Sequence, residues 1–599
     1  MNGQEHLEAR IEQLERRLKH YEYSQRALEG RIAAIENSLI YRILRRIGKP
    51  LLDAETKAAK MLGRPAPSFP GAMSYQAWVQ QESETELPAL ESAPSFALLV
   101  AYYGQPREWL ETTVAAVRAL RYPSWSLCIC HDESPEPWLA EYLVSVATAD
   151  RRVQITRAAK SLGTANALNE AAALSPCDYV MVLSPGDRPA PAALDWLASA
   201  APAELIYSDE DALDSKGERV DPVFKPGWSP DLLLSSMYLG RLMAVSRAAW
   251  QSAGGFRKDL EGAEEYDLAL RITDRPAAVR HVPRVLCHRP KAEAGGAADP
   301  ASVRKALEDA IERRGYAAEA ESAAGGVRWK TSGPTLASLI ICSRSPGLLE
   351  RCLETIAGST AWPHREVIVV HHLGPEDAAL KAAAERFGAV RVPYSGPFHF
   401  SLMNNIGAQA ARGEVLVFLN DDVEPLESSW LERLVAQAER PDVGVVGAKL
   451  LYPSGSLQHA GVVVGISDGC GHVGRGVFDV RYWPWLEMTR DVAAVTGACM
   501  AMRAAVFHEI GGFSNEFPVN YNDTDLCLRA RQAGYRVICD VGALLQHLEC
   551  QTRSRGVTFR ERERWYIQWG ELMEAGDQFY TSHLTREGED LTLRVVAGG

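Results

Sequence analysis

The chain has 599 residues, of which 46% are hydrophobic and 24% are charged, and its formal net charge is −13. This length is too great for one hydrophobic core, so we expect several domains of ordinary globular composition. The negative charge excludes a general nucleic-acid binder, because phosphate contacts require a basic face, and we expect no nucleic-acid partner.

The N-terminal sequence and the cysteines both favour a cytoplasmic protein. The first residues, MNGQEHLEARIEQLERR, lack the apolar core of a signal peptide, and no apolar run is long enough to cross a bilayer. The 11 cysteines contain no Cys-x-x-Cys pair, which favours free buried thiols in a reducing compartment. We therefore predict a cytoplasmic location.

Residues 1–48 repeat apolar side chains at alternating spacings of three and four, from Leu7 to Leu39. The repeat is typical of a coiled coil and predicts a homo-oligomer, and a single helix packed on the protein's own globular part is the alternative. The segment SLIYRILRRIGKPLL then combines apolar and basic residues in one helical pattern. Such a helix could rest on the inner face of the cell membrane or pack on the folded domains. Residues 49–94 are rich in proline toward their middle and are expected to form a linker with a short helix.

From Phe96 onward, strand patterns alternate with amphipathic helix patterns. FALLVAYY, EWLETTVAAVRAL and SLCICHD read as strand, helix and strand, and a similar series starts again near Pro334. We therefore place a first domain at residues 95–330 and a second at residues 331–599. The alternation predicts an α/β fold with a mostly parallel sheet in each domain.

The two domains are predicted to be copies of one fold. CDYVMVLSPGD, residues 177–187, aligns with GEVLVFLNDDV, residues 413–423. Further along, GGFRKDLEGAEEYDLALR aligns with GGFSNEFPVNYNDTDLCLR, and His288 then aligns with His547. A duplicated domain explains matches in the same order better than chance does.

A predicted strand in the second copy ends in Asn420, Asp421 and Asp422. In open parallel sheets ligands bind beyond the carboxyl ends of the strands. Adjacent carboxylates repel each other there, and Mg²⁺ or Mn²⁺ bound by their oxygens would relieve the repulsion. The alternative is an ordinary strand–loop turn with an aspartate cap.

An Asn-Asp-Thr-Asp cluster follows about a hundred residues later and precedes the helix pattern LCLRARQAG. Asp523 or Asp525 could cap that helix, which leaves one carboxylate available as a general base. His547 follows the strand pattern VGALLQH, where a further ligand for a metal or a diphosphate would be useful, although a single histidine is more often structural.

The ordered set LNDD, GGF, NDTDLCLR and H-x-E resembles the family 2 glycosyltransferases with the GT-A fold. FHFSLMNNIGAQAARGEVLVFLNDD and LLYPSGSLQHAGVVVG resemble bacterial tandem-domain transferases of polysaccharide and O-antigen synthesis. The resemblance covers residues 96–556 and implies two Rossmann-like GT-A domains behind the N-terminal coiled-coil helix. It also implies a metal-dependent, inverting hexosyl or deoxyhexosyl transferase with a UDP- or dTDP-sugar donor. The acceptor would be a hydroxyl of a glycan, a lipid-linked glycan or a protein.

The resemblance also implies roles for residues of the second copy. Asp421 and Asp422 match the acidic motif that binds the metal and the nucleotide diphosphate, with Asn420 beside them. His547 matches a metal ligand of the family. Asp523 matches the base that takes the proton from the acceptor hydroxyl as it attacks the anomeric carbon.

The first copy departs from this pattern. Glu265 matches the base, but the acidic strand end reads LSPGD and retains only Asp187. Asp209 or Asp211 would have to replace the missing carboxylates. The first copy is therefore either a degenerate scaffold or acceptor-binding domain, which we favour, or a transferase with unusual metal use.

An aspartate at the end of the second strand usually contacts the nucleotide in this family. The first copy retains it as Asp132, whereas the second copy has His371 and His372. Trp483 and Trp485 lie between the two acidic motifs and could stack on a sugar or pack in a core.

Three other functions compete with a single-site transferase. Both copies could be active, as in a polymerase of alternating repeats. The heptads and the incomplete first copy also suit a non-catalytic scaffold or a glycan-binding assembly protein. A glycoside hydrolase comes last, because it needs paired carboxylates but no nucleotide-binding strand end.

Overall fold

The computed structural model describes residues 74–82, 87–90, 92–131, 137–158, 163–291, 298–321, 326–478, 480, 483–548 and 557–594. The chain separates into two compact units, Met1–Ala72 and Met73–Gly599, and the described residues all belong to the second. The predicted coiled coil and the basic amphipathic segment therefore lie outside the described residues. No helix within the described ranges is both long and apolar enough to span a bilayer.

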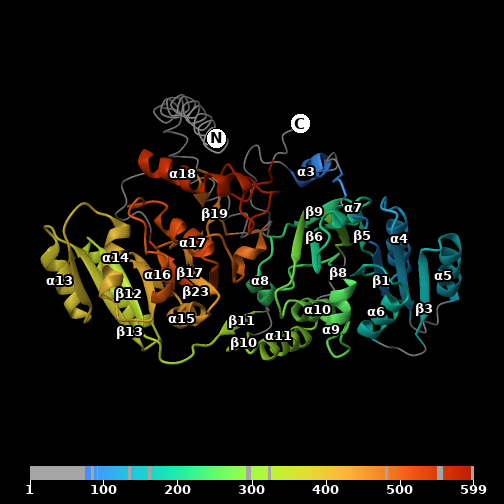
Figure 1. Ribbon diagram of the computed structural model, residues 1–599, viewed down its shortest axis with the longest axis horizontal. Coiled ribbons are helices and arrows are strands. Elements are labelled where there is room, and N and C mark those ends of the chain that lie inside the picture. Colours follow the sequence, from blue (N-terminus) through green and yellow to red (C-terminus); the bar gives the residue numbers. More distant parts are fainter. Residues whose placement is uncertain are drawn as a thin grey trace, which may run out of the picture. The chain divides into compact units, whose positions relative to one another are not determined.

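The first domain is built on a nine-stranded sheet (Figure 1). From one edge to the other its strands are β3 (Val153–Arg157), β2 (Trp125–His131), β1 (Phe96–Tyr102), β4 (Tyr179–Val182), β8 (Ala244–Ser246), β6 (Leu205–Leu213), β9 (Val279–Pro290) and β5 (Arg188–Pro189), with β7 (Arg219–Val223) on β6. β3, β2, β1 and β4 are parallel, as are β6 and β9, whereas β8 is antiparallel to both of its neighbours.

The second domain repeats this strand order in a ten-stranded sheet. Its strands are β14 (Val390–Tyr394), β13 (Arg365–His372), β12 (Ala337–Ser343), β15 (Val415–Asn420), β22 (Cys499–Arg503), β17 (Val443–Leu451), β23 (Arg536–His547) and β16 (Val423–Pro425), with β18 (Leu457–His459) on β17 and β21 (Arg490–Asp491) on β23. The matching order confirms the predicted duplication and the α/β class of both domains.

Helices cover both sheets in corresponding places. In the first domain these are α4 (Arg107–Arg118), α5 (Pro137–Ala149), α6 (Thr164–Ala173), α7 (Ala193–Ser199), α9 (Arg247–Ala253) and α10 (Glu264–Ile272). Their counterparts in the second domain are α12 (Pro346–Ser359), α13 (Asp377–Arg386), α14 (Phe400–Ala410), α15 (Trp430–Glu439), α16 (Ala504–Glu509) and α17 (Asn522–Gln532).

The remaining elements have no counterpart in the list above. They are α3 (Tyr75–Glu82), α8 (Pro230–Ser235), α11 (Pro300–Arg314), α18 (Phe559–Ala575), η1 (Pro484–Glu487) and the short strands β10 (Ala318–Ala320), β11 (Val327–Trp329), β19 (Val463–Val464) and β20 (Cys470–Gly471).

The central strands are buried on both faces, which explains their continuous apolar sequences. All seven residues of β12 are buried, and they alternate between two core layers. Leu339 and Ile341 face one layer and Ile340 faces the other, because successive strand side chains point to opposite faces. The layer that contains Ile340 also contains Leu99 of β1, so one hydrophobic cluster extends through both domains.

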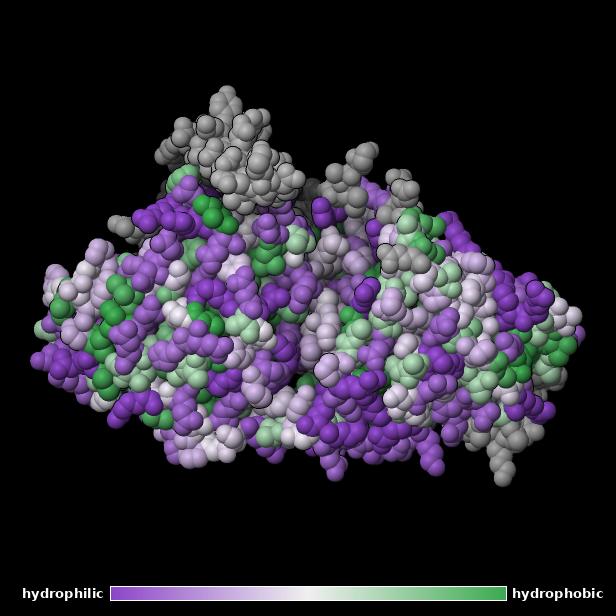
Figure 2. Space-filling view, in the orientation of Figure 1, coloured by the Kyte–Doolittle hydropathy of each residue, from purple (hydrophilic) through white to green (hydrophobic). Residues whose placement is uncertain are grey.

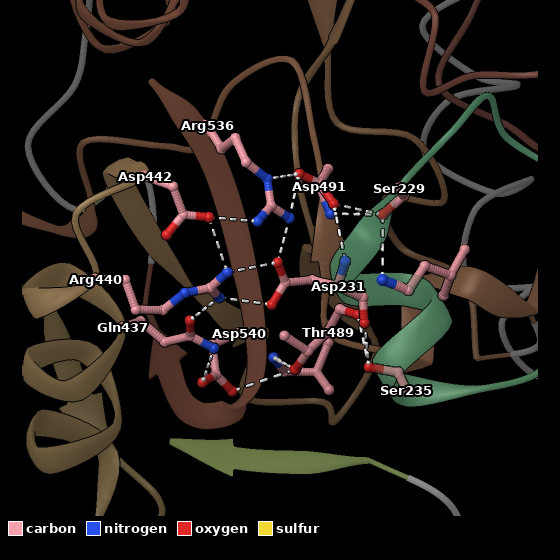
Figure 3. Close-up of polar contacts among 12 residues, drawn as sticks. Ser229, Asp231, Ser235, Gln437, Arg440, Asp442, Thr489, Asp491, Arg536 and Asp540 are labelled. Carbon is pink, nitrogen blue, oxygen red and sulfur yellow. Dashed lines mark hydrogen bonds and ion pairs between the residues drawn. The ribbon is translucent and has the colours of Figure 1, made fainter. Parts of the chain in front are cut away.

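A buried polar network also connects the two domains (Figure 3). Asp231, at the start of α8 in the first domain, is 2% exposed and binds the Arg440 guanidinium through two contacts of 2.7 and 3.1 Å. Arg536 of β23 bonds to the same carboxylate and also to Asp491. The Ser229 hydroxyl of the first domain donates to Asp491 Oδ2 at 2.7 Å. Each charged group therefore has an opposite charge close by, as buried charges require.

The outer surface is mixed in character. On the face shown in Figure 2, hydrophobic residues are scattered among hydrophilic ones over both domains. Scattered apolar residues of this kind are normal for a folded protein surface.

Candidate functional site

The carboxyl ends of β12 and β15 adjoin one another in the second domain. Cys342 of β12 pairs with Asn420 of β15, and the next residue, Ser343, donates a hydrogen bond from Oγ to Asp421 Oδ2 at 2.6 Å. Burial raises the pKa of Asp421 to about 6 against the lowering effect of this hydrogen bond, and the charge of Asp422 adds to the rise. Asp421 is therefore a buried carboxylate that benefits from a nearby cation or a proton.

Asp422 and His547 come together because β16 pairs with the end of β23. His547 is opposite Val423 in this pair, and His547 Nε2 is 3.0 Å from Asp422 Oδ1. Asn420 Nδ2 is 3.5 Å from the same His547 nitrogen. On the other side of the ring, His547 Nδ1 is 2.8 and 3.0 Å from the amide nitrogen and oxygen of Gln458. The Gln458 side chain thus fixes the orientation of the imidazole, a role that the sequence did not indicate.

Asp523 belongs to the same edge of the sheet, although it starts α17. The Gly497 N–H donates to Asp523 Oδ2 at 2.8 Å, and the Thr524 N–H donates to Oδ1 at 2.7 Å. The residue after Gly497, Ala498, accepts a backbone hydrogen bond from Asn420 N at 3.0 Å. One short connection before β22 therefore links the half-buried Asp523 carboxylate to the acidic end of β15.

Asp525 has a different role from Asp523. Its side chain is fully buried, and it accepts hydrogen bonds from Arg529 at 2.8 Å, from Gln568 at 2.8 Å and from Trp569 at 3.1 Å. Gln568 and Trp569 belong to α18, so their contacts hold α17 against α18. Of the two aspartates in the cluster, Asp525 is therefore structural. Asp523 is the one whose carboxylate is bound by the connection before β22, next to the acidic end of β15.

Three other residues considered from the sequence are buried. His371 is 3% exposed, and its Nδ1 is 2.9 Å from Asp377 Oδ1 at the start of α13. Trp483 packs against the tail that follows α18, and Trp485 donates from Nε1 to the Phe224 carbonyl of the first domain at 2.6 Å. The alternative of aromatic core packing therefore describes both tryptophans.

Comparisons with known proteins identify the family of both domains. Residues 98–201 match the model "Glycosyl transferase family 2", and residues 334–568 match "Glycosyltransferase like family 2". The O-antigen biosynthesis protein RfbC of Myxococcus xanthus is 34% identical over 588 residues, which cover 92% of this chain and 46% of RfbC. The uncharacterized protein y4gI of Sinorhizobium fredii is 30% identical over 647 residues, which cover 98% of this chain and 70% of y4gI.

The chain belongs to the family 2 glycosyltransferases. It spans less than half the length of RfbC. Among solved structures, GalNAc-T7 with UDP, GalNAc and Mn²⁺ aligns with 43% of this chain and 52% of its own, at 14% identity and a TM-score of 0.34.

The first glycosyltransferase domain has a different strand end. Arg188 of β5 is opposite His288, just as Val423 of β16 is opposite His547. By this register Asp187 corresponds to Asp422. The alignment of residues 177–187 with residues 413–423 had instead paired Asp187 with Val423, one residue further on. Gly186 then corresponds to Asp421, and it has a φ of 101°. A Cβ atom at Gly186 would lie 2.5 Å from Pro290, so no side chain can replace the missing carboxylate there.

Arg241 brings a cation to this strand end. β8 and β22 pair with β4 and β15 in the same register, so Arg241 corresponds to Ala498. The Arg241 guanidinium donates to Ser184 Oγ and is 3.6 Å from Asp187 Oδ2. An arginine thus stands beside the one remaining carboxylate of the strand end.

Glu265 is the second residue of α10, as Asp523 is the second residue of α17. Burial raises the pKa of Glu265 to about 7, the Arg241 guanidinium opposes the rise, and the Asp187 charge adds to it. Glu265 therefore lies within electrostatic reach of the Arg241 cluster. Asp132, the nucleotide-side residue expected in this domain, falls outside the described residues.

Asp209 and Asp211 are both engaged by the protein itself. Asp209 is bound by His281 at 2.8 Å and by His583 of the C-terminal tail at 3.0 Å. Burial alone would raise the pKa of Asp209, but the two histidines lower it to about 2. Asp211 is bound by His288 at 2.6 Å and by the Tyr75 hydroxyl of α3 at 2.6 Å.

The sequence could not have indicated these contacts, because α3 and the tail lie at opposite ends of the described chain. Asp209 and Asp211 therefore both have partners within the protein, and the partner of Asp211, His288, is the residue opposite Arg188 beside Asp187. Across the described residues as a whole, no three His, Cys, Asp or Glu side chains are grouped closely enough to hold a metal ion.

Proposed function

We propose that the protein transfers a sugar from a nucleotide diphospho-sugar to an acceptor hydroxyl during cell-surface polysaccharide synthesis, with the chemistry in the second domain. One observation carries the proposal: the Asp422–His547 pair and Asp523 lie at the same edge of the sheet. The similarity to the O-antigen protein RfbC supports the biosynthetic context. The donor would be a UDP- or dTDP-sugar, and the acceptor a glycan, a lipid-linked glycan or a protein.

The residues at this edge suit Mg²⁺ or Mn²⁺. Such ions are usually held by one or two protein ligands together with substrate phosphates and water, so the two ligands Asp422 and His547 suffice. If His547 Nδ1–H donates to Gln458 Oε1, the Nε2 lone pair faces Asp422, as in a ligand oriented by its neighbour. The bound ion would neutralise the diphosphate as it leaves. The buried Asp421 would add negative charge beside the ion, held in place by Ser343.

Asp523 suits the role of general base. Two backbone N–H groups hold its carboxylate, so its orientation is fixed before the acceptor arrives. It would take the proton from the acceptor hydroxyl as that oxygen attacks the anomeric carbon. Attack from the face opposite the diphosphate is a single displacement, which inverts the anomeric configuration.

The first domain is proposed to be non-catalytic. Arg241 stands beside its one strand-end carboxylate, Asp209 is bound by His281 and His583, and Asp211 is bound by His288 and Tyr75. The raised pKa of Glu265 favours the second candidate, a two-site enzyme, because a base that titrates near 7 suits proton abstraction. Glu265→Gln distinguishes the two candidates, since only a two-site enzyme would change its product.

Self-association through the N-terminal coiled coil and contact with the inner face of the cell membrane remain predictions from the sequence. A cytoplasmic location would give the enzyme access to nucleotide-sugars. A non-catalytic scaffold or glycan-binding protein would show no metal-dependent turnover of a nucleotide-sugar, which separates that class from the proposal.

Thermal stabilisation by nucleotide-sugars with Mn²⁺ tests the site directly, because a ligand specific to the folded state raises its stability. We expect one donor to raise the melting temperature and Asp422→Ala to remove that shift. Asp523→Asn should keep the shift and lose transfer, and the exposed Glu427→Gln should change neither. Turnover by Asp523→Asn at the wild-type rate would disprove the base, and an unaltered shift in Asp422→Ala would disprove the metal site.

A further inference from the structure

The dipeptide Gln458-His459 at the end of β18 lies between the two halves of the proposed site. The Gln458 side chain contacts His547 on the metal side. The neighbouring His459 is 1% exposed and contacts the connection that precedes β22 on the base side. Two successive residues of the LLYPSGSLQHAGVVVG stretch thus contact the metal side and the base side of the proposed site, one each.

The hydrogen bonds of His459 determine where its proton is. Its Nε2 accepts backbone N–H groups from Gly461 at 3.3 Å and from Thr496 at 3.4 Å. A nitrogen that accepts cannot carry the hydrogen, so the hydrogen is on Nδ1. His459 Nδ1 is 2.8 Å from His472 Nδ1, which must then accept. The hydrogen of the His472 ring is consequently on Nε2.

Burial keeps the His459 ring neutral. Desolvation lowers the pKa of His459 well below its ordinary value, and the neighbouring His472 and Arg490 lower it further. The pair is therefore a neutral, directional contact that joins β18 to the segment after β20.

Each histidine of this contact is connected to a segment that contacts Asp523 or its neighbour Thr524. Thr496, which donates to His459, immediately precedes Gly497, whose N–H holds the Asp523 carboxylate. On the other side, Cys470 Sγ is 3.7 Å from the hydroxyl of Thr524, the residue next to Asp523. The tail then fixes the His472 backbone, since its N–H donates to Glu589 Oε1 at 2.8 Å.

We propose that His459 and His472 are positioning residues that hold the connection before β22 and the segment after β20 against the start of α17, and so orient the base Asp523. The proposal rests on the proposed function, because it concerns the orientation of that base. It assigns the pair no part in holding the metal or the donor. Loss of the contact should therefore lower kcat while leaving donor binding in place.

Two substitutions of His472 separate this role from simple packing. Asparagine can place an oxygen where histidine has Nδ1, so His472→Asn keeps an acceptor for His459, whereas His472→Leu removes it. We expect His472→Leu to lower kcat about tenfold with the KM for the donor changed less than about twofold. His472→Asn should retain at least about half of the wild-type kcat. Equal activity of the leucine variant and wild type, equal losses in both variants, or a loss confined to KM would each overturn the proposal.

The ring tautomers give a test that does not depend on activity or on the stability of a variant. In ¹⁵N-histidine NMR spectra of the wild-type protein at pH 7, His459 should be the neutral Nδ1–H tautomer and His472 the Nε2–H tautomer. A charged His459 or the opposite tautomer would contradict the proposal. If the wild type turned over no nucleotide-sugar, the proposed function would fail instead, and the tautomers would still report whether the contact exists.

Discussion

Asp187 and Asp422 occupy equivalent places in two copies of one fold, yet their neighbours differ. Asp422 faces a histidine nitrogen at 3.0 Å, and Asp187 faces an arginine at 3.6 Å. Two substitutions of partner account for the difference: the second domain has Ala498 where the first has Arg241, and His288, which corresponds to His547, contacts Asp211. A side chain with a permanent positive charge thus replaces a small one that leaves room beside the carboxylates.

The pH dependence of Glu265→Gln tests the environment of this cluster. The pKa of Glu265 is raised from 4.5 to about 7, so its contribution to stability is present below pH 4.5 and is lost as the pH rises through 7. The glutamine variant should match wild type at pH 4.5 and be more stable by about 1–3 kcal/mol at pH 8.5. Urea unfolding at the two pH values measures the difference.

Two comparisons make this experiment decisive. The exposed Glu218→Gln serves as the control and should unfold like wild type at both pH values. A non-catalytic first domain also requires that Glu265→Gln leave product and rate unchanged. A stability that does not respond to pH would contradict the raised pKa of the half-buried Glu265, and a changed product would favour the two-site enzyme.

The positions of residues at the end of one strand or the start of one helix could be predicted from the sequence. Asp421 and Asp422 follow an apolar strand, and Asp523 starts an amphipathic helix, so periodicity alone locates them. Gln458 and Arg241 could not be found in this way. Their roles depend on which strands pair, and pairing is a property of residues far apart in the chain.

Among the elements of the fold, too, some features could be predicted from local sequence patterns and others depend on strand pairing. The strands and helices of each copy and their repetition were recognisable, because each has its own periodicity. The reversed β8 and β22 within otherwise parallel regions were not, since a three- or five-residue strand carries little signal of direction. Sequence alignment also missed the one-residue difference between the strand ends, which appears only in the pairing of β5 and β16.

The contact of α8 with β21 and β23 shows how one element joins the two domains (Figure 3). Asp231→Ala would leave the buried Arg440 and the half-buried Arg536 beside an uncharged side chain. Removing one partner of a buried pair typically costs about 3–5 kcal/mol, so we expect a loss of that size in the free energy of unfolding. Chemical denaturation measures it.

A surface pair provides the control for Asp231→Ala. Glu308 forms an exposed contact with Arg304 at 2.8 Å within α11, and Glu308→Ala should cost less than about 1 kcal/mol. Similar small losses in both variants would mean that the Asp231 network contributes little to the association of the domains.

At the scale of the whole molecule, the first domain is part of the support for the second. One hydrophobic cluster includes residues of both, and Trp485 of the second domain donates to the Phe224 carbonyl of the first. The tail after α18 also contacts both domains. Its His583 binds Asp209 of the first domain, and its Glu589 accepts a hydrogen bond from the His472 backbone of the second. The first domain can therefore be required for the shape of the second, whether or not it carries a site of its own.

This connection predicts that the domains unfold together. A donor bound with Mn²⁺ at the second domain, at about 100 times its Kd, stabilises the folded state by about 2.7 kcal/mol. If both domains form one cooperative unit, amides of β1 should gain the same protection from hydrogen exchange as amides of β12, although β1 is in the other domain. Exchange measured by mass spectrometry with and without the donor gives both values at once. Protection confined to residues 337–343, with no change at residues 96–102, would show that the domains open separately and that the interface serves only to hold them side by side.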